Sequence, residues 1–405
     1  RFDGACSGQG DRLEFVVNER FRLGRADGTQ RIDGLAGLVL RTSRHYAVVS
    51  SETLSPLERR NLRRWGEAVT AKVLKSLIGG PPSPLDDRMA LALETLRVPG
   101  LFPFNRFHDP AIQRRVAAYV ADGVLEVVAA RDPDSPRAAG RVYDSFYSAV
   151  FADHGSPRGH LAQISHRAVR WAARAQPLST MRLRRRLYDF HRLPLSRAWR
   201  RRLPDRHTTL RFLGADRRPP PGWRRRSAPG WLGLERLDVS SRAPPHAPAG
   251  PFKLYVSPLP HRTPEVLESL WPWLYRFPVQ AMKVADSVAG LLRPEKLVVY
   301  AARLDTLAEL AWRLLEDVEV AAHGVPFSAE IGGRGLVSWG VDRHRGGVVR
   351  SWRAWLIQRL AVALAAPARF GEGVPSWRRA LERVRLEGVD LERWQPGARL
   401  WLHGA

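Results

Sequence analysis

The chain has 405 residues, enough for two or three domains whose cores need no disulfide or metal to be stable. Hydrophobic residues make up 44% of it and include 14 tryptophans, which excludes an intrinsically disordered chain. A single cysteine, Cys6, excludes a disulfide framework and is typical of a reducing cytoplasm, where we expect the protein to act. No apolar run approaches the roughly 18 residues of a membrane span, so no membrane partner is expected.

The net charge of +25 is unevenly distributed. Its densest part is residues 181–226, with the runs Arg184–Arg186, Arg200–Arg202 and Arg224–Arg226. Such a field attracts nucleic acid, acidic peptides or phosphorylated substrates. One interpretation is therefore a nucleic-acid-binding region over residues 181–226. The other is a solvated surface in a chain that uses arginine wherever a positive charge suffices.

The first 249 residues predict a mixed, mainly helical region. The expected elements are short strands within residues 12–50, a helix over 57–78, a helix from Pro110 (after Asp109 as its N-cap) to about Ala130, and further helix within 141–190. Proline-rich stretches at both ends of residues 217–249 predict an irregular Arg/Pro-rich surface loop there. A domain boundary is expected directly after it.

The pattern changes at residue 250. The expected elements are a strand over 252–257, a helix over 263–276, strands over 279–284 and 297–301, a helix over 305–319 and a strand over 336–339. This β-α-β-β-α-β order predicts a compact, split βαβ-like domain over residues 250–345. A helical tail is expected over residues 346–405, broken at Pro367 and Pro375. The predicted fold class is therefore α+β.

Only five of the 65 basic residues are lysine, and three of these lie at strand ends of the predicted 250–345 domain. Lys253 opens its first strand, Lys283 closes the second and Lys296 opens the third. Arginine stays protonated, whereas a desolvated lysine can lose its proton and act as a base. Short strands in one sheet can bring their ends together, so we expect the three amines to share one cleft. Their mutual repulsion would then lower the pKa of at least one lysine.

The three lysines stand in short motifs: Lys253-Leu254-Tyr255-Val256-Ser257, Met282-Lys283-Val284 and Glu295-Lys296-Leu297. Together with the closing segment 324–340, they resemble the lyase domain of class III and IV lanthionine synthetases. That domain has a Lys-x-His-Val-Ser strand, a Phe-Lys strand end and a Gly-Lys-Phe strand at comparable spacing. It is related to the phosphothreonine lyases that bacterial pathogens use as effectors.

The resemblance implies β-elimination of phosphate from phosphoserine or phosphothreonine in a modified, RiPP precursor-type peptide, without a cofactor or metal. It implies that Lys253 is the base that removes the α-proton. Tyr255, which stands where the family has histidine, would be the general acid, with Lys283 as a third catalytic group. Because nothing here resembles a kinase, a separate kinase is an expected partner, together with a cyclase protein.

The phosphate-binding groups are less sharply defined. Lys296 is the first candidate, since the resemblance implies that Lys283 and Lys296 bind phosphate or stabilise the enolate-like intermediate. Glu330 lies in the segment where the family has a phosphate-binding arginine, and it would repel phosphate if it faced the site. The nearby candidates for that role are Arg293, Arg303 and Arg334.

Two further interpretations stay open. A phenol cannot hold a positive charge near phosphate as a protonated histidine does, so the chain could be a catalytically inactive lyase-like module that binds a peptide or scaffolds an assembly. It could also be the nucleic-acid-binding protein that residues 181–226 indicate. His160 and His166 are six residues apart, the wrong spacing for a shared metal-binding face, and Gly332–Gly335 predict a hairpin turn rather than an anion-binding nest.

Overall fold

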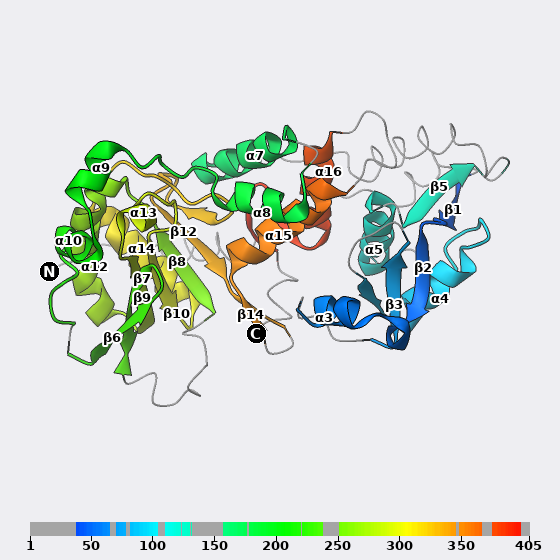
Figure 1. Ribbon diagram of the computed structural model, residues 1–405, viewed down its shortest axis with the longest axis horizontal. Helices are drawn as coiled ribbons and strands as arrows, with labels where there is room; N and C mark the ends of the chain where they lie inside the picture. Colours follow the sequence, from blue (N-terminus) through cyan, green and yellow to red (C-terminus); the bar gives the residue numbers. More distant parts are fainter. Residues whose placement is uncertain are drawn as a thin grey trace, which may run out of the picture.

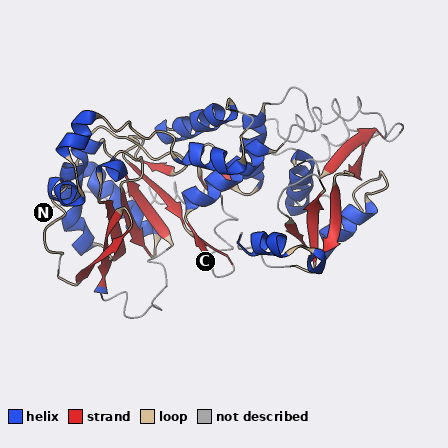
Figure 2. Ribbon diagram, in the orientation of Figure 1, coloured by secondary structure: helices blue, strands red, loops and turns tan. Residues whose placement is uncertain are grey.

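The computed structural model describes residues 38–64, 70–77, 82–103, 110–122, 124–129, 131, 157–175, 178–219, 221–237, 251–345, 348–366 and 375–397. Figure 1 shows three parts along the long axis of the molecule: a small N-terminal part with strands and helices, a central group of helices, and a large sheet with helices around it. Figure 2 shows the longer strands at the two ends of the molecule, with helices beside them, and mainly helices in the middle.

The N-terminal part combines two small antiparallel sheets with helices. Its elements are β1 (Leu38–Thr42), β2 (Tyr46–Ser50), η1 (Ser51–Thr53), α3 (Pro56–Arg64), β3 (Lys72–Ser76), β4 (Ser83–Leu85), α4 (Asp87–Thr95), α5 (Pro110–Ala121) and β5 (Leu125–Ala129). Strands β2, β3 and β4 form one sheet, and β1 pairs with β5. Leucines and valines from α4, α5 and the strands form a shared core.

Two helix predictions in this part are wrong in their second halves. The helix expected over residues 57–78 is α3, which ends at Arg64, and Lys72–Ser76 is strand β3. Val73 and Leu74 pair with β2 and are buried, while Leu77 is exposed, so cross-strand burial overrides the apolar spacing that predicted a helix. The helix from Pro110 ends at Ala121, and strand β5 follows it. Strands expected before residue 38 lie outside the described residues.

The central part is a bundle of helices from two distant segments of the chain. Its elements are α7 (His160–Ala173), α8 (Thr180–Tyr188), α15 (Trp352–Ala365), α16 (Ser376–Leu386), β15 (Val389–Asp390) and β16 (Gln395–Pro396). The helices share one core, which includes the fully buried Trp352. Helix α16 also contacts α5, where Arg383 Nε donates to both carboxylate oxygens of Asp122 at 2.8 and 2.9 Å. Helix within 157–190 and after residue 351 was predicted; residues 141–156 and 367–374 lie outside the described ranges.

The large sheet has seven strands in the order β11-β12-β8-β10-β9-β7-β6, and all neighbours are antiparallel. The elements of this part are α9 (Arg197–Arg202), α10 (Arg206–Phe212), β6 (Trp223–Ala228), β7 (Trp231–Arg236), β8 (Phe252–Val256), η2 (Pro260–Arg262), α12 (Thr263–Arg276), β9 (Val279–Ala285), α13 (Val288–Leu291), β10 (Leu297–Ala301), α14 (Leu304–Asp317), β11 (Ala329–Ile331), β12 (Val337–Val341), β13 (Arg343–Arg345) and β14 (Val348–Arg350). Strands β8 and β9 run parallel on either side of β10, and α12 connects them. Strands β10 and β12 flank β8 in the same way, so the α+β class and the split βαβ order are confirmed.

One face of this sheet packs on α12 and α14. Leu254 and Val256 of β8 share a core with leucines of both helices. Because successive side chains of a strand point to opposite faces, Lys253 and Tyr255 lie on the other face. The fold therefore uses the apolar face for stability and presents the polar face to the central helices.

The predicted irregular loop over residues 217–249 is wrong for its middle part. Strands β6 and β7 form a hairpin that extends the sheet, with Gly230 at positive φ in its turn. Trp223, Leu232 and Leu234 enter the core, while Arg224 and Arg226 both pair with Glu235 on the exposed side. Alternating burial thus outweighs the proline and arginine content. The sheet includes strands from both sides of residue 249, and the domain boundaries stay a prediction.

Candidate functional site

Three of the predicted site residues lie on the polar face of the sheet. Lys253 and Tyr255 are two residues apart on β8, and Lys283 is on β9. The register places Tyr300 beside Lys253, and Val298 between Tyr255 and Lys283. Lys253, Tyr255 and Lys283 therefore share one face across three adjacent strands.

Lys253 is held by a carboxylate that directly follows β12. Its Nζ lies 2.6 Å from Oδ2 of Asp342, and both side chains are buried. Burial raises the pKa of Asp342, although the Lys253 charge and hydrogen bond act in the opposite direction. The other oxygen, Oδ1, has no hydrogen-bond partner among the described residues. Lys253 also faces the ring of Tyr300, with Nζ 5.1 Å from its centroid.

Lys283 belongs to a second charge cluster. Its Nζ lies 3.4 Å from Oε1 of Glu295, and Arg353 of α15 donates from Nη1 to Oε2 of that carboxylate at 2.8 Å. Burial alone would raise the pKa of Glu295, but the charges of Lys283 and Arg353 outweigh it and lower the pKa. Arg353 is fully buried and also donates from Nε to the carbonyl of Pro326 at 2.9 Å. Its Nη2 has no hydrogen-bond partner among the described residues.

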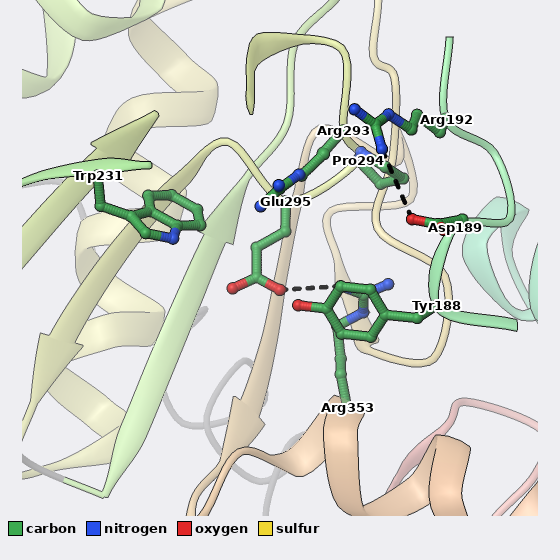
Figure 3. A pocket seen from close by; sticks show the side chains of 8 residues that line it. All are labelled: Tyr188, Asp189, Arg192, Trp231, Arg293, Pro294, Glu295 and Arg353. Atoms are coloured by element: carbon green, nitrogen blue, oxygen red, sulfur yellow. Dashed lines mark hydrogen bonds and ion pairs between the residues drawn. The ribbon is translucent and has the colours of Figure 1, made fainter. Parts of the chain in front are cut away.

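A small pocket opens beside this cluster (Figure 3). It holds about 280 Å³ of free space, part of it open solvent, and is lined by Tyr188, Asp189, Arg192, Trp231, Arg293, Pro294, Glu295 and Arg353. Lys283 adjoins it, with Nζ 4.2 Å from the centroid of the Trp231 ring. In Figure 3 the side chain of Arg293 extends above Glu295. Of the arginines suggested by the sequence, Arg293 is thus the one that lines the pocket.

The phenols of the site are strongly protected from ionisation. Burial, together with the carboxylates of Glu295 and Asp342, raises the pKa of Tyr255 well above its ordinary value. Burial also raises the pKa of Tyr300 to about 12. Tyr255 is completely buried, and the hydrogen-bonding side chain that acts on its hydroxyl is Ser351. These phenols are therefore neutral at physiological pH and are weak proton donors.

Lys296 does not join the pocket. It is completely buried, and its Nζ lies 2.8 Å from Nδ1 of His323 and 3.2 Å from Oγ of Ser257. His323 Nε2 lies 2.6 Å from the backbone oxygen of His191, and His191 Nε2 lies 2.8 Å from the backbone oxygen of His323. Burial lowers the pKa of Lys296 well below its ordinary value and that of His323 to about 3. The expected lowering of a lysine pKa thus comes from burial and not from repulsion between amines.

The remaining predicted residues lie away from the pocket. Arg303 is exposed and donates from Nε to Asp305 at 3.0 Å, and Arg334 is exposed in the β11–β12 turn. That turn is the hairpin expected at the glycines. Glu330 accepts hydrogen bonds from the backbone N–H of Leu161 at 2.9 Å and of Gly335 at 2.7 Å. It therefore caps the N-terminus of α7, where the N-cap residue offers no side-chain hydrogen bond, and it does not line the pocket.

The sequence interpretation missed several residues that shape the site. Glu295 appeared only as part of a motif, and Asp342 and Arg353 did not appear as candidates. Their side chains reach the lysines from a β-strand end and a distant helix, so no local spacing relates them to Lys253 or Lys283. The sequence could have indicated only that such partners exist, because a lysine buried on a sheet face needs an oppositely charged or hydrogen-bonding partner.

Comparisons with known proteins give a distant structural likeness. No protein-family model and no curated protein sequence matches the chain. An effector protein from Pseudomonas syringae pv. tomato strain DC3000 is similar at 14% identity and a TM-score of 0.39, over 58% of this chain and 98% of that one. The phosphothreonine lyase SpvC from Salmonella is similar at 15% identity and a TM-score of 0.26, over 44% of this chain and 88% of SpvC. The phosphothreonine lyase OspF from Shigella flexneri is similar at 13% identity and a TM-score of 0.25, over 32% of this chain and 74% of OspF.

At this level of similarity the residues of the site have to support any functional conclusion. Within the described ranges, no group of histidine, cysteine, aspartate and glutamate side chains is arranged to hold a metal ion. The helices in those ranges include none with the length and apolar character of a membrane span.

Proposed function

We propose that this protein is a lyase-like enzyme that eliminates phosphate from phosphoserine or phosphothreonine in a peptide. The observation that supports it most directly is the buried Nη2 of Arg353, which lacks a hydrogen-bond partner among the described residues and belongs to a pocket-lining side chain. An unpaired buried guanidinium nitrogen is costly unless an anion completes it. Arg293 and Lys283 add positive charge beside the same pocket.

The reaction needs a base at the α-carbon, and Lys253 is our candidate. A neutral amine requires somewhere for its proton, and Asp342 lies 2.6 Å away with a pKa that burial raises. The electrons of the broken Cα–H bond form the Cα=Cβ double bond, and the Cβ–O bond breaks with its electron pair going to phosphate. The products are a dehydrated residue and inorganic phosphate.

The leaving phosphate needs a proton donor, and two residues are candidates. Tyr255 corresponds to the family histidine, but it is buried and its raised pKa makes proton release difficult. Lys283 is partly exposed beside the pocket and, as an ammonium group, can both neutralise phosphate and donate a proton. Lys283 is therefore the better-placed acid.

The wider setting follows from the chemistry. A phosphorylated peptide has to be made by a separate kinase, and a dehydrated residue can react further with a thiol in a cyclase reaction. A RiPP precursor-type peptide is the substrate class that the sequence resemblance implies, and we propose it as the natural substrate.

A second candidate is a phosphopeptide-binding module without catalysis. The specific observation in its favour is the Lys253–Asp342 ion pair, because a lysine that stays protonated cannot remove a proton. The nucleic-acid interpretation has no comparable support from the pocket.

The test is incubation of the protein with synthetic phosphothreonine and phosphoserine peptides, followed by phosphate detection and mass spectrometry. Elimination gives inorganic phosphate and a peptide lighter than the unphosphorylated form by one water. Phosphate release with the hydroxyl restored would indicate hydrolysis and contradict the proposal. Binding without any mass change would support the module instead.

A further inference from the structure

The segment that leads into the pocket is unusually rich in arginine. Residues 157–202 contain thirteen arginines and a single acidic residue, Asp189. Within it, α8 buries Leu183 and Leu187 against the helical core. The side chains of Arg182, Arg184 and Arg185 are exposed, and we call these three residues the α8 arginine face.

The stability of α8 accounts for only part of this charge. Arg182 lies in the first turn, where the helix dipole disfavours a cation. Arg182 and Arg186 are four residues apart, a spacing at which like charges repel. Among the residues that the structure describes, only Arg185 of the three has a carboxylate nearby, with Nε 3.7 Å from Oδ2 of Asp189. Arg185 also lies in the last turn, where the helix dipole favours a cation. Helix stability therefore accounts for Arg185 but not for Arg182 and Arg184, which indicates a use of these two residues outside the fold.

The α8 arginine face also continues into the pocket. Helix α8 ends at Tyr188, and Tyr188, Asp189 and Arg192 all line the pocket. Asp189 joins the two regions, since it lies near Arg185 on the helix and 3.8 Å from Nη1 of Arg192. Figure 3 shows Asp189 and Arg192 on the same side of the pocket as Arg293.

We propose that the α8 arginine face binds an acidic segment of the peptide whose phosphorylated residue enters the pocket. The proposal rests on the proposed function and adds a substrate requirement to it: aspartate or glutamate residues next to the phosphorylation site. Guanidinium groups pair well with carboxylates, and a field of one sign beside the pocket raises the local concentration of such a peptide.

The aromatic side chains of this region favour a peptide over a nucleic acid. Single-stranded nucleic acid binds by stacking its bases on free aromatic faces. The Trp171 ring already has the Arg186 guanidinium 3.3 Å from its centroid and the Phe190 ring at 5.3 Å. The Trp377 ring has Arg170 at 4.4 Å. An acidic peptide, in contrast, can bind through the exposed guanidinium groups alone, because its carboxylates need no free aromatic face.

The test uses two unphosphorylated, fluorescently labelled peptides that differ only in glutamate or glutamine around the central threonine. Because neither can be eliminated, anisotropy measures docking apart from catalysis. The triple variant R182Q/R184Q/R185Q should bind the glutamate peptide about eightfold more weakly, since each of the three exposed pairs contributes a factor of about two. Binding of the glutamine peptide should not change. In the elimination assay, the triple variant should still process the phosphorylated glutamine peptide at the wild-type rate.

A matched variant, R218Q/R276Q/R313Q, removes the same charge from exposed positions outside α8 and should bind the glutamate peptide normally. Equal loss in both variants would overturn the proposal, because net charge alone would explain it. So would equal affinity of wild type for the two peptides. Tighter binding of a single-stranded oligonucleotide than of the glutamate peptide at the same salt concentration, lost in R182Q/R184Q/R185Q, would replace it by the nucleic-acid interpretation. Failure of elimination with docking intact would count against the proposed function only.

Discussion

Lys283 and Lys296 have similar positions in the sequence and opposite environments in the structure. The sequence places both at strand ends, whereas in the structure Lys283 lies within β9 and Lys296 directly before β10 of the same sheet. Lys283 is partly exposed, faces the carboxylate of Glu295 and adjoins the pocket. Lys296 is completely buried and forms hydrogen bonds with a histidine nitrogen and a serine hydroxyl.

This difference separates two uses of a lysine. Lys283 lies beside a carboxylate and next to the pocket, the position that the proposed function assigns to a phosphate-binding group. At Lys296 burial favours the neutral form, which links Ser257, His323 and His191 in a network that holds the connections around the sheet. A lowered pKa therefore does not by itself mark the catalytic base.

The largest effect on stability is expected where the charge cluster at Lys283 is broken. Arg353→Met keeps the volume but leaves buried Glu295 with Lys283 as its remaining cation. Loss of one partner of a buried ion pair costs about 3–5 kcal/mol, so urea denaturation should show a loss of that size. Arg303→Met, at an exposed ion pair, is the control and should not shift the midpoint. A small effect of Arg353→Met would mean that the cluster is solvated.

A smaller effect should distinguish Lys296 by pH. Its folded pKa lies below the unfolded value of about 10.4, so the unfolded chain binds more protons between the two values. The free energy of unfolding should therefore rise with pH across that window, by at most about 1.4 kcal/mol per pH unit. Lys296→Met should remove this slope, whereas Lys72→Met, at an exposed pair, should keep it. An unchanged slope in Lys296→Met would show that Lys296 is charged in the folded state.

The smallest effect concerns Glu330, which caps α7 instead of facing phosphate. Glu330→Ala removes two hydrogen bonds to backbone N–H groups and should reduce stability by about 1–2 kcal/mol. Phosphopeptide affinity, measured by calorimetry, should stay the same. Tighter phosphopeptide binding in Glu330→Ala would instead indicate that this carboxylate repels the ligand.

Much of the fold could be predicted from local patterns. The alternation in Phe252–Val256, the apolar run Leu297–Ala301 and the periodic helix Leu304–Asp317 each correspond to an element of the structure. Failures occurred where long-range pairing overrides local spacing. Lys72–Ser76 becomes a strand because β2 pairs with it, and Trp223–Ala228 because β7 does.

The site was predictable only in part. Strand alternation brings Lys253, Tyr255 and Lys283 to one face of the sheet, and the sequence motifs around these residues are enough to predict this. The partner carboxylate of Lys253, Asp342, lies 89 positions later in the chain, and Arg353 comes from a helix of the tail. Only tertiary packing relates such residues, so neither they nor the burial of Lys296 follow from spacing.

The most direct test of the account is the elimination rate of Lys253→Arg on a phosphothreonine peptide. Arginine keeps the charge and can still pair with Asp342, but it cannot lose a proton. We expect the rate to fall by about 10² to 10⁴, as for loss of a general base, with unchanged circular dichroism and peptide affinity. Lys75→Arg, at the distant Glu58 pair, should keep the wild-type rate. A wild-type rate in Lys253→Arg would contradict the assignment of Lys253 as the base.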